Sequence, residues 1–400
     1  MLPVAGLAAI SFTALAAGAQ QSDKLTVISP ASLPKAYATP SANNGAKIVS
    51  KPADAHLNLP PGFSAEAIAE DFSNVRMVAV APCGDIFTVE SGPGRISVLR
   101  DTKGTGKPDV REVFAEGLRQ AFGITFHKDG LYVGTPTAVL RFDYKDGQLK
   151  ASGEPKVVVA DLPTGGHWTR SVLFHPKTNK MYVTVGSAGD YGDSVPNRAV
   201  VMEYNEDGTG GRPYAEGLRN AVGIDFQPGT GTLWTAVNER EGLGDDLPPD
   251  YVTSVKEGAH YGWPNYLGAG TLDPRAKEDP DIKKRFALPD VMVTAHSAAL
   301  GIVFYTGKMF PKEYQGSAFV AFHGSGNRSK RTGYNVVNIP FKNGKCSGGF
   351  REFVGGWVIG GEDGKEAWGR PVGLAVAKDG ALLIADDGGN KIWRVTYKKP

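Results

Sequence analysis

Residues 223–237 read GIDFQPGTGTLWTAV, two runs of alternating apolar residues joined by a turn rich in Pro, Gly and Thr. Alternation with a period of two is typical of strands that bury one face, so this stretch predicts a β-hairpin. A longer echo supports a repeat, because AEGLRQAFGITF at 115–126 returns as AEGLRNAVGIDF at 215–226. The chain holds six copies of the hairpin pattern, the other five at 77–90, 123–135, 171–186, 301–322 and 373–387.

Several copies are followed by a further apolar strand, as in GRISVLR at 94–100 and NKIWRV at 390–395. Each copy therefore predicts part of a four-stranded sheet. One such sheet cannot bury both of its faces, whereas radial packing of several sheets buries both and leaves only short edges. We predict an all-β fold, a six-bladed β-propeller, over residues 59–400. The alternatives are a seven- or eight-bladed propeller with a degenerate blade, and a β-sandwich.

The composition agrees with a globular β-protein. Of 400 residues, 52 are Gly, which permits many tight turns between short strands. The 44 Lys and Arg nearly balance the 42 Asp and Glu, so we expect no nucleic-acid partner, which would need a basic surface. An apolar content of 41% excludes a disordered chain. The only cysteines are Cys83 and Cys346, and the sequence leaves their pairing open.

The chain begins with an apolar stretch. Residues 3–19 read PVAGLAAISFTALAAGA, an uncharged run that ends in small residues. This predicts a signal peptide over residues 1–19 and a secreted protein, with a membrane anchor as the alternative. Residues 20–58, rich in Ser, Ala, Pro and Lys, are predicted to be an N-terminal tail. No later segment reaches membrane-spanning length, so we expect no membrane partner.

Polar side chains stand immediately before the apolar strand that opens most copies. In a propeller, these positions converge at one mouth of the central axis. Converging guanidinium groups suit a ligand with several carboxylates or phosphates, and a His among them can act as base or ligand. The alternative is structural, with hydrogen bonds between blades for the Arg side chains and core packing for His167. The residues at these positions are Arg119, His167, Arg170, Arg219, Asn220, His296 and Arg370, and the first copy has Asn74 and Arg76 in the comparable place.

Motifs spread over residues 59–395 carry a family resemblance. They are LPPGFSAEAIAE, GGHWTRSVLFHP, AEGLRNAVGIDF, GAHYGWPNY, TAHSAALGIVFY, HGSGNRSKRTGY and GRPVGLAV, the last followed by ADDGGNKIWRV. With them, the chain resembles the sorbosone dehydrogenase family, within the superfamily of soluble quinoprotein glucose and aldose dehydrogenases. It is most similar there to the fungal pyranose dehydrogenases that use pyrroloquinoline quinone.

The resemblance implies two cofactors, pyrroloquinoline quinone and a calcium ion that binds and polarises it. His167 matches the general base, which takes the proton of the sugar hydroxyl while hydride passes to the quinone. Glu241 and Gly242 lie in the loop that supplies the calcium ligands. The mouth and the resemblance together predict a set of cofactor-binding residues: Arg119, Arg219, Asn220, His296, Asn327, Arg328 and Arg370.

Two departures from the glucose dehydrogenases concern the surroundings of His167. Gly166 stands where those enzymes have an Asp beside the base, and Ser187 stands roughly where they have the Asp that orients it. Asp190 and Asp193 are the local candidates for the orienting partner. Both differences favour the sorbosone and pyranose branch.

The predicted function is therefore a secreted quinoprotein that oxidises a pyranose, aldose or osone. An external acceptor, such as a cytochrome domain or a quinone, would take the electrons, because no haem-binding C-x-x-C-H motif occurs in the chain. Two alternatives remain at this stage. One is a calcium-dependent lactonase-type hydrolase, and the other is a propeller that binds a partner without catalysis.

Overall fold

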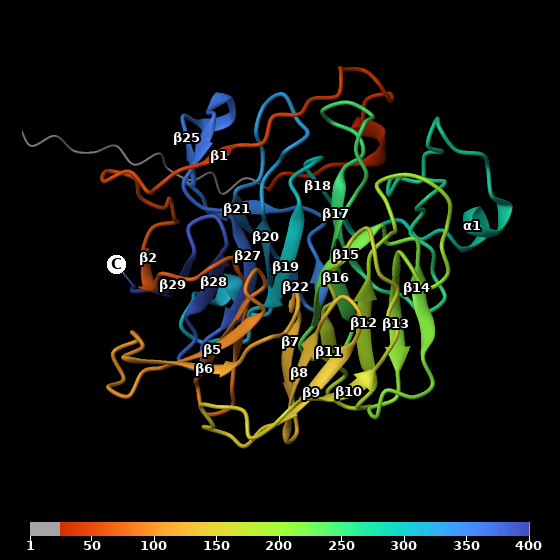
Figure 1. Cartoon of the computed structure of the whole chain (residues 1–400). Helices are drawn as coiled ribbons and strands as arrows, with labels where there is room; N and C mark the ends of the chain where they lie inside the picture. The colour runs from red at the N-terminus through yellow and green to blue at the C-terminus, as the bar shows by residue number, and fades with distance from the viewer. Residues whose placement is uncertain (1–24, 400) are drawn as a thin grey trace, which may run out of the picture.

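The computed structural model describes residues 25–399 and folds them almost entirely into β-structure (Figure 1). Six antiparallel sheets of four strands dominate the molecule. The predicted all-β class is confirmed. In the described part of the chain, helix is confined to α1 (Pro280–Arg285) and the short 3-10 segments η1 (Pro30–Ser32), η2 (Lys312–Tyr314) and η3 (Gly361–Asp363).

Each sheet is built almost entirely from strands that follow one another in the chain. The first three sheets, in order of pairing, are β3 (Val75–Val80), β4 (Ile86–Glu90), β5 (Arg95–Arg100) and β6 (Val110–Ala115); β7 (Ile124–His127), β8 (Gly130–Gly134), β9 (Val139–Asp143) and β10 (Lys156–Val159); and β11 (Val172–Phe174), β12 (Met181–Val185), β13 (Val200–Tyr204) and β14 (Arg212–Glu216). The next three are β15 (Asn220–Phe226), β16 (Leu233–Asn238), β17 (Asp250–Ser254) and β18 (Val291–Val293); β19 (Ala299–Phe304), β20 (Ala318–Phe322), β21 (Asn335–Ile339) and β24 (Arg351–Val354); and β27 (Pro371–Val376), β28 (Leu382–Asp386), β29 (Lys391–Tyr397) and β2 (Phe63–Ala69). Smaller sheets join β1 (Lys47–Ile48), β26 (Glu366–Ala367) and β25 (Val358–Ile359), and β22 (Phe341–Lys342) with β23 (Lys345–Cys346).

The first strands of the six sheets form a closed ring. Each contacts the first strand of the next sheet, in the order β3, β7, β11, β15, β19 and β27, and β27 returns to β3. This cyclic order is the arrangement of a β-propeller, with the six strands around a common axis. The ring is held shut by β2, which pairs with β29, so the two ends of the ring share one sheet.

The repeated glycines lie where neighbouring innermost strands approach most closely. A Cβ on Gly123 would collide with the carbonyl oxygen of Arg170 at the start of the next sheet's inner strand. A Cβ on Gly223 would collide in the same way with the carbonyl oxygen of Leu300. Gly occupies these positions because only a residue without a side chain allows backbones to come this near to each other around the axis.

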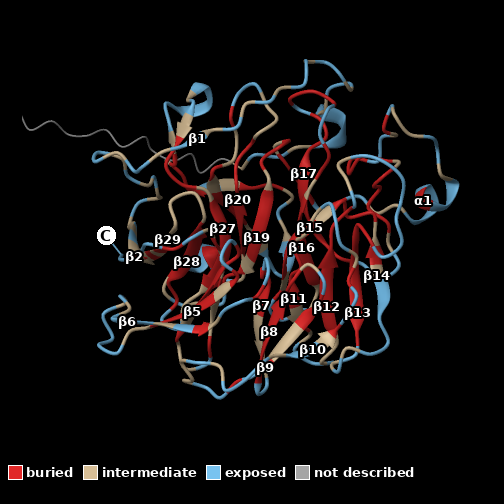
Figure 2. Ribbon diagram, in the orientation of Figure 1, coloured by how far each residue is buried: buried red, intermediate tan, exposed pale blue. Residues whose placement is uncertain are grey.

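Apolar side chains fill the space between adjacent sheets, as the buried strand interiors in Figure 2 indicate. Between the first and second sheets, the ring of Phe87 lies 5.3 Å from that of Phe114 and 5.0 Å from that of Phe126, both edge to face. Phe87 is fully buried, so its truncation to Ala would cost about 3–5 kcal/mol. This packing fixes the sheets and therefore fixes the loops at the ends of their inner strands.

Residues 25–58, which we call the N-terminal strap, lie along loops at one end of the ring (Figure 1, red to orange). The backbone N–H of Tyr37 donates to the carbonyl oxygen of Leu243 over 2.8 Å, and that of Asn44 donates to Gly326 over 2.6 Å. Further along, β1 pairs in parallel with β26. The region predicted as a tail thus packs against loops of three sheets, whereas the predicted signal peptide lies outside the described residues.

Two further observations concern the chain as a whole. Within residues 25–399, no helix is both long and apolar enough to cross a membrane. Cys83 and Cys346 are both free thiols. The two cysteines, whose pairing the sequence left open, therefore do not form a disulfide with each other.

Candidate active site

A layer of apolar side chains closes the axis where the innermost strands begin. We call this layer the floor, and it consists of Met77, Phe122, Trp168, Val222, Leu300 and Val372. On one side of the floor, the six strands enclose a cavity of about 320 Å³. On the other side lies the mouth, where the polar residues that precede the strands are found. The floor therefore gives the mouth an apolar base with charged groups near it.

His167 lies at the mouth and is held through its Nδ1 atom. This atom is 3.0 Å from the Ser187 hydroxyl and 3.1 Å from the Ser187 carbonyl oxygen. The hydroxyl itself donates to the carbonyl oxygen of Gly189 over 2.6 Å. Since both Ser187 oxygens then act as acceptors, Nδ1 carries the proton, and the lone pair of His167 stands on Nε2.

The surroundings of His167 keep its imidazole neutral. Burial, followed by the positive charge of Arg219, lowers the pKa of His167 to about 4. A neutral ring with a free Nε2 lone pair is the form that a general base requires. The orienting partner is therefore Ser187, and neither Asp190 nor Asp193 contacts the ring by a hydrogen bond.

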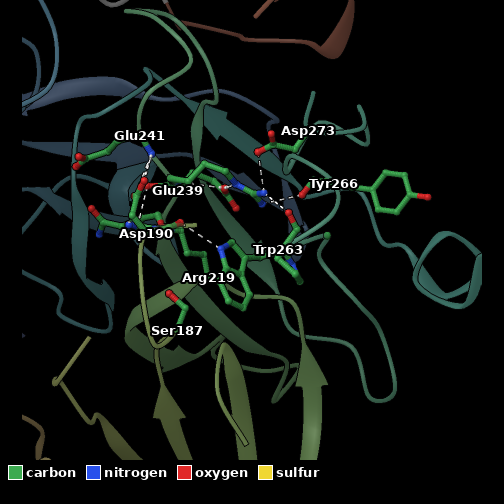
Figure 3. A network of polar contacts seen from close by, with 12 residues as sticks. Ser187, Asp190, Arg219, Glu239, Glu241, Trp263, Tyr266 and Asp273 are labelled. Atoms are coloured by element: carbon green, nitrogen blue, oxygen red, sulfur yellow. Dashed lines mark hydrogen bonds and ion pairs between the residues drawn. The ribbon is translucent and has the colours of Figure 1, made fainter. Parts of the chain in front are cut away.

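Arg219 links the segment that contains Ser187 and Asp190 to the loop that follows β16 (Figure 3). Its Nη2 atom donates to Asp190 Oδ1 over 2.6 Å, and Nη1 donates to the carbonyl oxygens of Asn238 at 3.1 Å and Glu239 at 2.8 Å. Asp190 Oδ1 also accepts from the backbone N–H of Glu241 at 3.1 Å. Most N–H groups of Arg219 are thus hydrogen-bonded within the protein, so this side chain contributes mainly positive charge to the mouth.

Asn220 offers an unused acceptor close to the base. Its Oδ1 atom is buried and makes no hydrogen bond. A Cβ built on Gly186 would lie 2.6 Å from this oxygen and also 2.6 Å from the Cβ of His167, so Gly186 lets the two side chains come together. An orphaned buried acceptor beside a neutral imidazole points to a missing polar ligand.

A second polar cluster at the mouth involves Arg76, His323, Arg370 and Asp387. Arg76 Nη1 donates to Asp387 Oδ2 over 2.8 Å, and His323 Nε2 lies 2.8 Å from Asp387 Oδ1. Arg370 Nε donates to the carbonyl oxygen of His323 over 3.1 Å. Asp387 therefore bridges a cation from the first sheet and an imidazole from the fifth.

The charges of this cluster sum to a positive value. Burial lowers the pKa of His323 to about 4 despite the neighbouring Asp387, so this imidazole is neutral as well. Burial alone would raise the pKa of Asp387, but His323, Arg76 and Arg370 together hold it below its usual range. Two guanidinium groups therefore face a single carboxylate.

Arg76 also links this cluster to the floor. Its guanidinium lies 5.5 Å from the ring centre of Phe122 and 5.8 Å from that of Trp168, and its Nε is buried without a partner. Arg76, His323 and Asp387 are absent from the predicted set of cofactor-binding residues. Arg76 lies at the start of the first inner strand, in the place comparable to the predicted residues, and Asp387 directly follows β28.

Three of the predicted residues form a separate group farther along the same face. Nε2 of His296 lies 2.9 Å from the carbonyl oxygen of Gly244. Arg328 Nη1 donates to the carbonyl oxygen of Asp245 over 3.0 Å and pairs with Asp246 at 2.7 Å. Asn327 precedes Arg328 in this loop. The structure thus associates His296, Asn327 and Arg328 with the 244–246 loop, while Arg119 is exposed and no described contact ties it to either group.

The loop that carries Glu241 and Gly242 is held by a buried ion network (Figure 3). Arg240 pairs with Glu239 at 3.0 Å and with Asp273 at 3.2 Å, and all three side chains are inaccessible to solvent. Burial and the charge of Asp190 raise the pKa of Glu241. Among the described residues, no group of three or more His, Cys, Asp or Glu is arranged to hold a metal ion.

A family model described as TrAA12-like matches residues 57–257 and 269–398. The chain belongs to the TrAA12-like family. The residues at the mouth fall within the TrAA12-like match, whereas the N-terminal strap up to residue 56 and the loop 258–268 fall outside it. The predicted resemblance to quinoprotein sugar dehydrogenases is thereby confirmed at the level of the family.

Individual relatives agree with this assignment. A pyrroloquinoline quinone-dependent sugar dehydrogenase of Hypocrea jecorina is 22% identical over 333 residues, covering 70% of this chain and 74% of that protein. The Trichoderma reesei structure of carbohydrate-active enzyme family AA12 superposes with a TM-score of 0.77 at 18% identity, over 88% of this chain and 99% of that one. The holo pyrroloquinoline quinone domain of Coprinopsis cinerea pyranose dehydrogenase gives 0.73 at 19% identity, over 87% and 100%. These TrAA12-like and pyranose dehydrogenase structures share the fold of this chain.

Proposed function

We propose that this protein is a secreted sugar dehydrogenase that binds pyrroloquinoline quinone and calcium at the mouth of a six-bladed β-propeller. Its substrate is a pyranose, aldose or osone, and its electrons pass to a separate acceptor, a cytochrome domain or a quinone. One observation carries the proposal. An apolar floor lies beside two Arg side chains that share one carboxylate and a neutral His with a free lone pair.

The residues at the mouth fit a planar tricarboxylate. Within residues 25–399, Arg76 Nε and Asn220 Oδ1 are buried polar atoms without partners, so Arg76 can donate a hydrogen bond to a ligand and Asn220 can accept one. The net positive charge around Asp387 suits carboxylates, and the rings of Phe122 and Trp168 suit the face of an aromatic ring system. We assign Arg76, Asn220 and Arg370 as the residues that hold the cofactor, with Arg219 adding charge.

Pyrroloquinoline quinone, when bound, supplies the acceptor for the hydride that leaves the sugar carbon. The protein supplies the base. Nε2 of His167 accepts the proton of the sugar hydroxyl, while Ser187 keeps the Nδ1 proton in place and so maintains the reactive tautomer. The resulting positive imidazolium is offset by Asp190, which acts to raise the pKa of His167.

We place the calcium ion at the Glu241–Gly242 loop. Two features favour this position: the carboxylate of Glu241 stands near that of Asp190, and buried Arg240 keeps the loop backbone in place. A calcium ion would add positive charge beside the cofactor. His296, Asn327, Arg328 and Arg119 remain proposed members of the wider cofactor-binding set.

Reconstitution tests the proposal. Purified protein is mixed with pyrroloquinoline quinone and CaCl₂, and dye reduction is measured with a panel of sugars. We expect turnover that needs both additions, together with a change in the absorbance spectrum of the quinone. Failure to bind the quinone would overturn the proposal, and hydrolysis of lactones without quinone would favour a hydrolase instead.

A further inference from the structure

Only two aromatic side chains of the described residues are exposed. Tyr37 is 56% exposed and Tyr191 is 40% exposed, whereas every other Phe, Trp and Tyr in residues 25–399 is buried or half-buried. Exposed rings lose the stabilisation that burial gives, so two of them at one place point to an external ligand. The two residues are far apart in sequence, in the N-terminal strap and in the loop that follows β12.

The Tyr191 ring lies at Arg275, and Tyr37 is bound nearby, because its backbone N–H donates to Leu243, two residues beyond the Glu241 carbonyl oxygen that accepts from Arg275. The Arg275 guanidinium is 4.4 Å from the centre of the Tyr191 ring, and the Tyr191 hydroxyl donates to the Arg275 carbonyl oxygen. The hydrogen bond that Arg275 donates to Asp273 raises the pKa of Arg275, and the Tyr37 phenol acts in the same direction. A surface cation therefore packs on the Tyr191 ring, and the strap brings Tyr37 to the neighbouring Leu243 segment.

Arg275 is held rigidly, which fixes the Tyr191 ring in turn. Its Nε and Nη2 atoms donate to the two oxygens of buried Asp273 at 2.9 and 2.8 Å, and its Nη1 donates to the Glu241 carbonyl oxygen at 3.2 Å. One face of the Tyr191 ring is thus occupied by a cation, a contact that orients the ring before any ligand arrives. A side chain ordered in advance binds with a smaller loss of entropy.

This surface adjoins the proposed active site. Tyr191 follows Asp190, which binds Arg219, and Glu241 contacts both Asp190 and Arg275 (Figure 3 shows Asp190, Arg219, Glu241 and Asp273 within one network). The backbone of Tyr37 is bound to Leu243, two residues beyond Glu241. A ligand that occupies the mouth and extends past Glu241 therefore meets the two rings.

We propose that Tyr37, Tyr191 and Arg275 form a binding subsite for a second pyranose unit, so that the substrate is an oligosaccharide. This inference rests on the proposed oxidation of sugars at the mouth. The C–H groups on one face of a pyranose carry partial positive charge and pack on the negative face of an aromatic ring. The sugar hydroxyls would form hydrogen bonds with the remaining N–H groups of Arg275 and with the carboxylate of Glu241.

The composition of the patch favours a saccharide over an apolar partner. A stable protein interface buries a continuous apolar core, whereas here the exposed Tyr191 ring packs on a guanidinium that is bound to Asp273 and Glu241. The strap that carries Tyr37 precedes the region matched by the family model, which begins at residue 57. Tyr37 therefore gives this chain a contact that the family match does not include.

Binding is measured first, by titration calorimetry of the full chain without added cofactor. The probes are cellotetraose, xylotetraose and mannotetraose. We expect one of them to bind, and we expect Tyr191→Ala and Tyr37→Ala each to raise its Kd by about 5- to 10-fold, as loss of an aromatic contact does. Tyr191→Phe should stay within about 2-fold, because it keeps the ring face. Val157→Ala, at an exposed apolar side chain of β10, is the control.

Turnover by the reconstituted enzyme provides the second measurement. The kcat/KM for the tetrasaccharide, divided by that for its monosaccharide, should fall about 5- to 10-fold in the two Ala variants. A protein that binds the tetrasaccharide through these rings but shows no quinone-dependent turnover would refute the proposed function and keep the subsite. Unchanged binding and an unchanged ratio in both Ala variants, or no binding of any of the three probes, would overturn the subsite.

Discussion

His167 and His323 occupy two sides of the same mouth, and their surroundings differ. His167 is half-buried and His323 is buried, and each has a pKa of about 4, so both imidazoles are neutral. His167 is held at Nδ1 by the uncharged oxygens of Ser187, whereas Nε2 of His323 faces the carboxylate of Asp387. Asp387 in turn pairs with Arg76, a cation that packs over the floor.

The difference separates two tasks. The nitrogen of His167 that faces away from Ser187 has no partner in the part of the chain that the structure describes, so it is free to accept a proton from a ligand. Nε2 of His323 contacts a carboxylate that also binds Arg76, so His323 belongs to the charged framework that we propose as the cofactor site. A buried His–Asp pair resembles a catalytic dyad in composition, but the proposed base is His167, because it keeps a free lone pair.

The largest expected effect comes from removing the base. His167→Ala should lower kcat by about 10³-fold, within the range for loss of a positioned general base, while pyrroloquinoline quinone still binds. His323→Ala should instead weaken cofactor binding more than it lowers kcat. Dye-reduction kinetics and a fluorescence titration of the quinone separate the two outcomes. If His323→Ala lost turnover with full cofactor binding, the roles assigned to the two His would be reversed.

The next effect concerns the charged framework around His323. Asp387→Asn leaves Arg76 and Arg370 without their buried counter-ion, so the free energy of unfolding should fall by about 3 kcal/mol. Thermal and denaturant unfolding of the apoprotein measure this. Asp129→Asn is the matched control, because its ion pair with Arg141 is at the surface and should contribute under about 1 kcal/mol. An equal loss of unfolding free energy in the two variants would show that the Asp387 ion pair stabilises the protein no more than a surface ion pair does.

The protonation of His167 gives a third test. Because burial and Arg219 disfavour the imidazolium, its pKa lies at about 4 instead of 6.5. The base is therefore neutral above this value and becomes protonated, and inactive, as the pH falls through about 4. Titration of the imidazole NMR signals measures it, with the signal assigned by its loss in His167→Gln. A midpoint near 6.5 would contradict the assigned environment.

A smaller effect is expected at the residue that orients the base. Ser187→Ala removes the hydroxyl but leaves the carbonyl oxygen, which still accepts the Nδ1 proton of His167. Loss of one neutral hydrogen bond costs about 1 kcal/mol, so kcat should fall about 5-fold with KM little changed. A Ser187→Thr variant, which keeps the hydroxyl, should recover most of the rate. No recovery would indicate a packing defect and not an orienting role.

The smallest effect is expected at the far side of the floor. Asp225 lines the axial cavity, where its two oxygens accept from the backbone N–H groups of Phe226 at 2.8 Å and Phe304 at 2.6 Å. Burial raises its pKa to about 7. The floor separates it from the mouth, so Asp225→Asn should leave kcat and KM within about 2-fold, as a substitution outside the site does. A large loss of turnover would mean that the cavity takes part in the reaction.

Much of the architecture could be predicted because its signals are local. Alternation of apolar residues and the turns between them mark each hairpin. The paired strands β15 and β16 correspond to the predicted hairpin at 223–237, and β27 and β28 correspond to the one at 373–387, with boundaries that differ by one to three residues. The phase of the polar residues before the inner strands also placed His167, Asn220 and Arg370 at the mouth. These predictions depend on neighbours in sequence, which share one strand or one turn.

Partners across the ring could not be predicted in the same way. Arg76 and Asp387 are 311 residues apart, and His323 meets Asp387 across 64 residues. Nor does the sequence show that Arg219 turns its guanidinium toward the carbonyl oxygens of Asn238 and Glu239, because that choice depends on the path of another sheet's loop.

The sequence by itself thus determined the strands, the glycines between them and the type of side chain that stands before each inner strand. Only the tertiary structure decided which of these side chains keep a free hydrogen-bonding atom. Closure of the ring brings loops from different sheets together, and a donor or acceptor is available to a ligand only when no such loop has already satisfied it. Ser187 therefore orients His167, Asp387 neutralises Arg76, and the strap brings Tyr37 to the edge of the site.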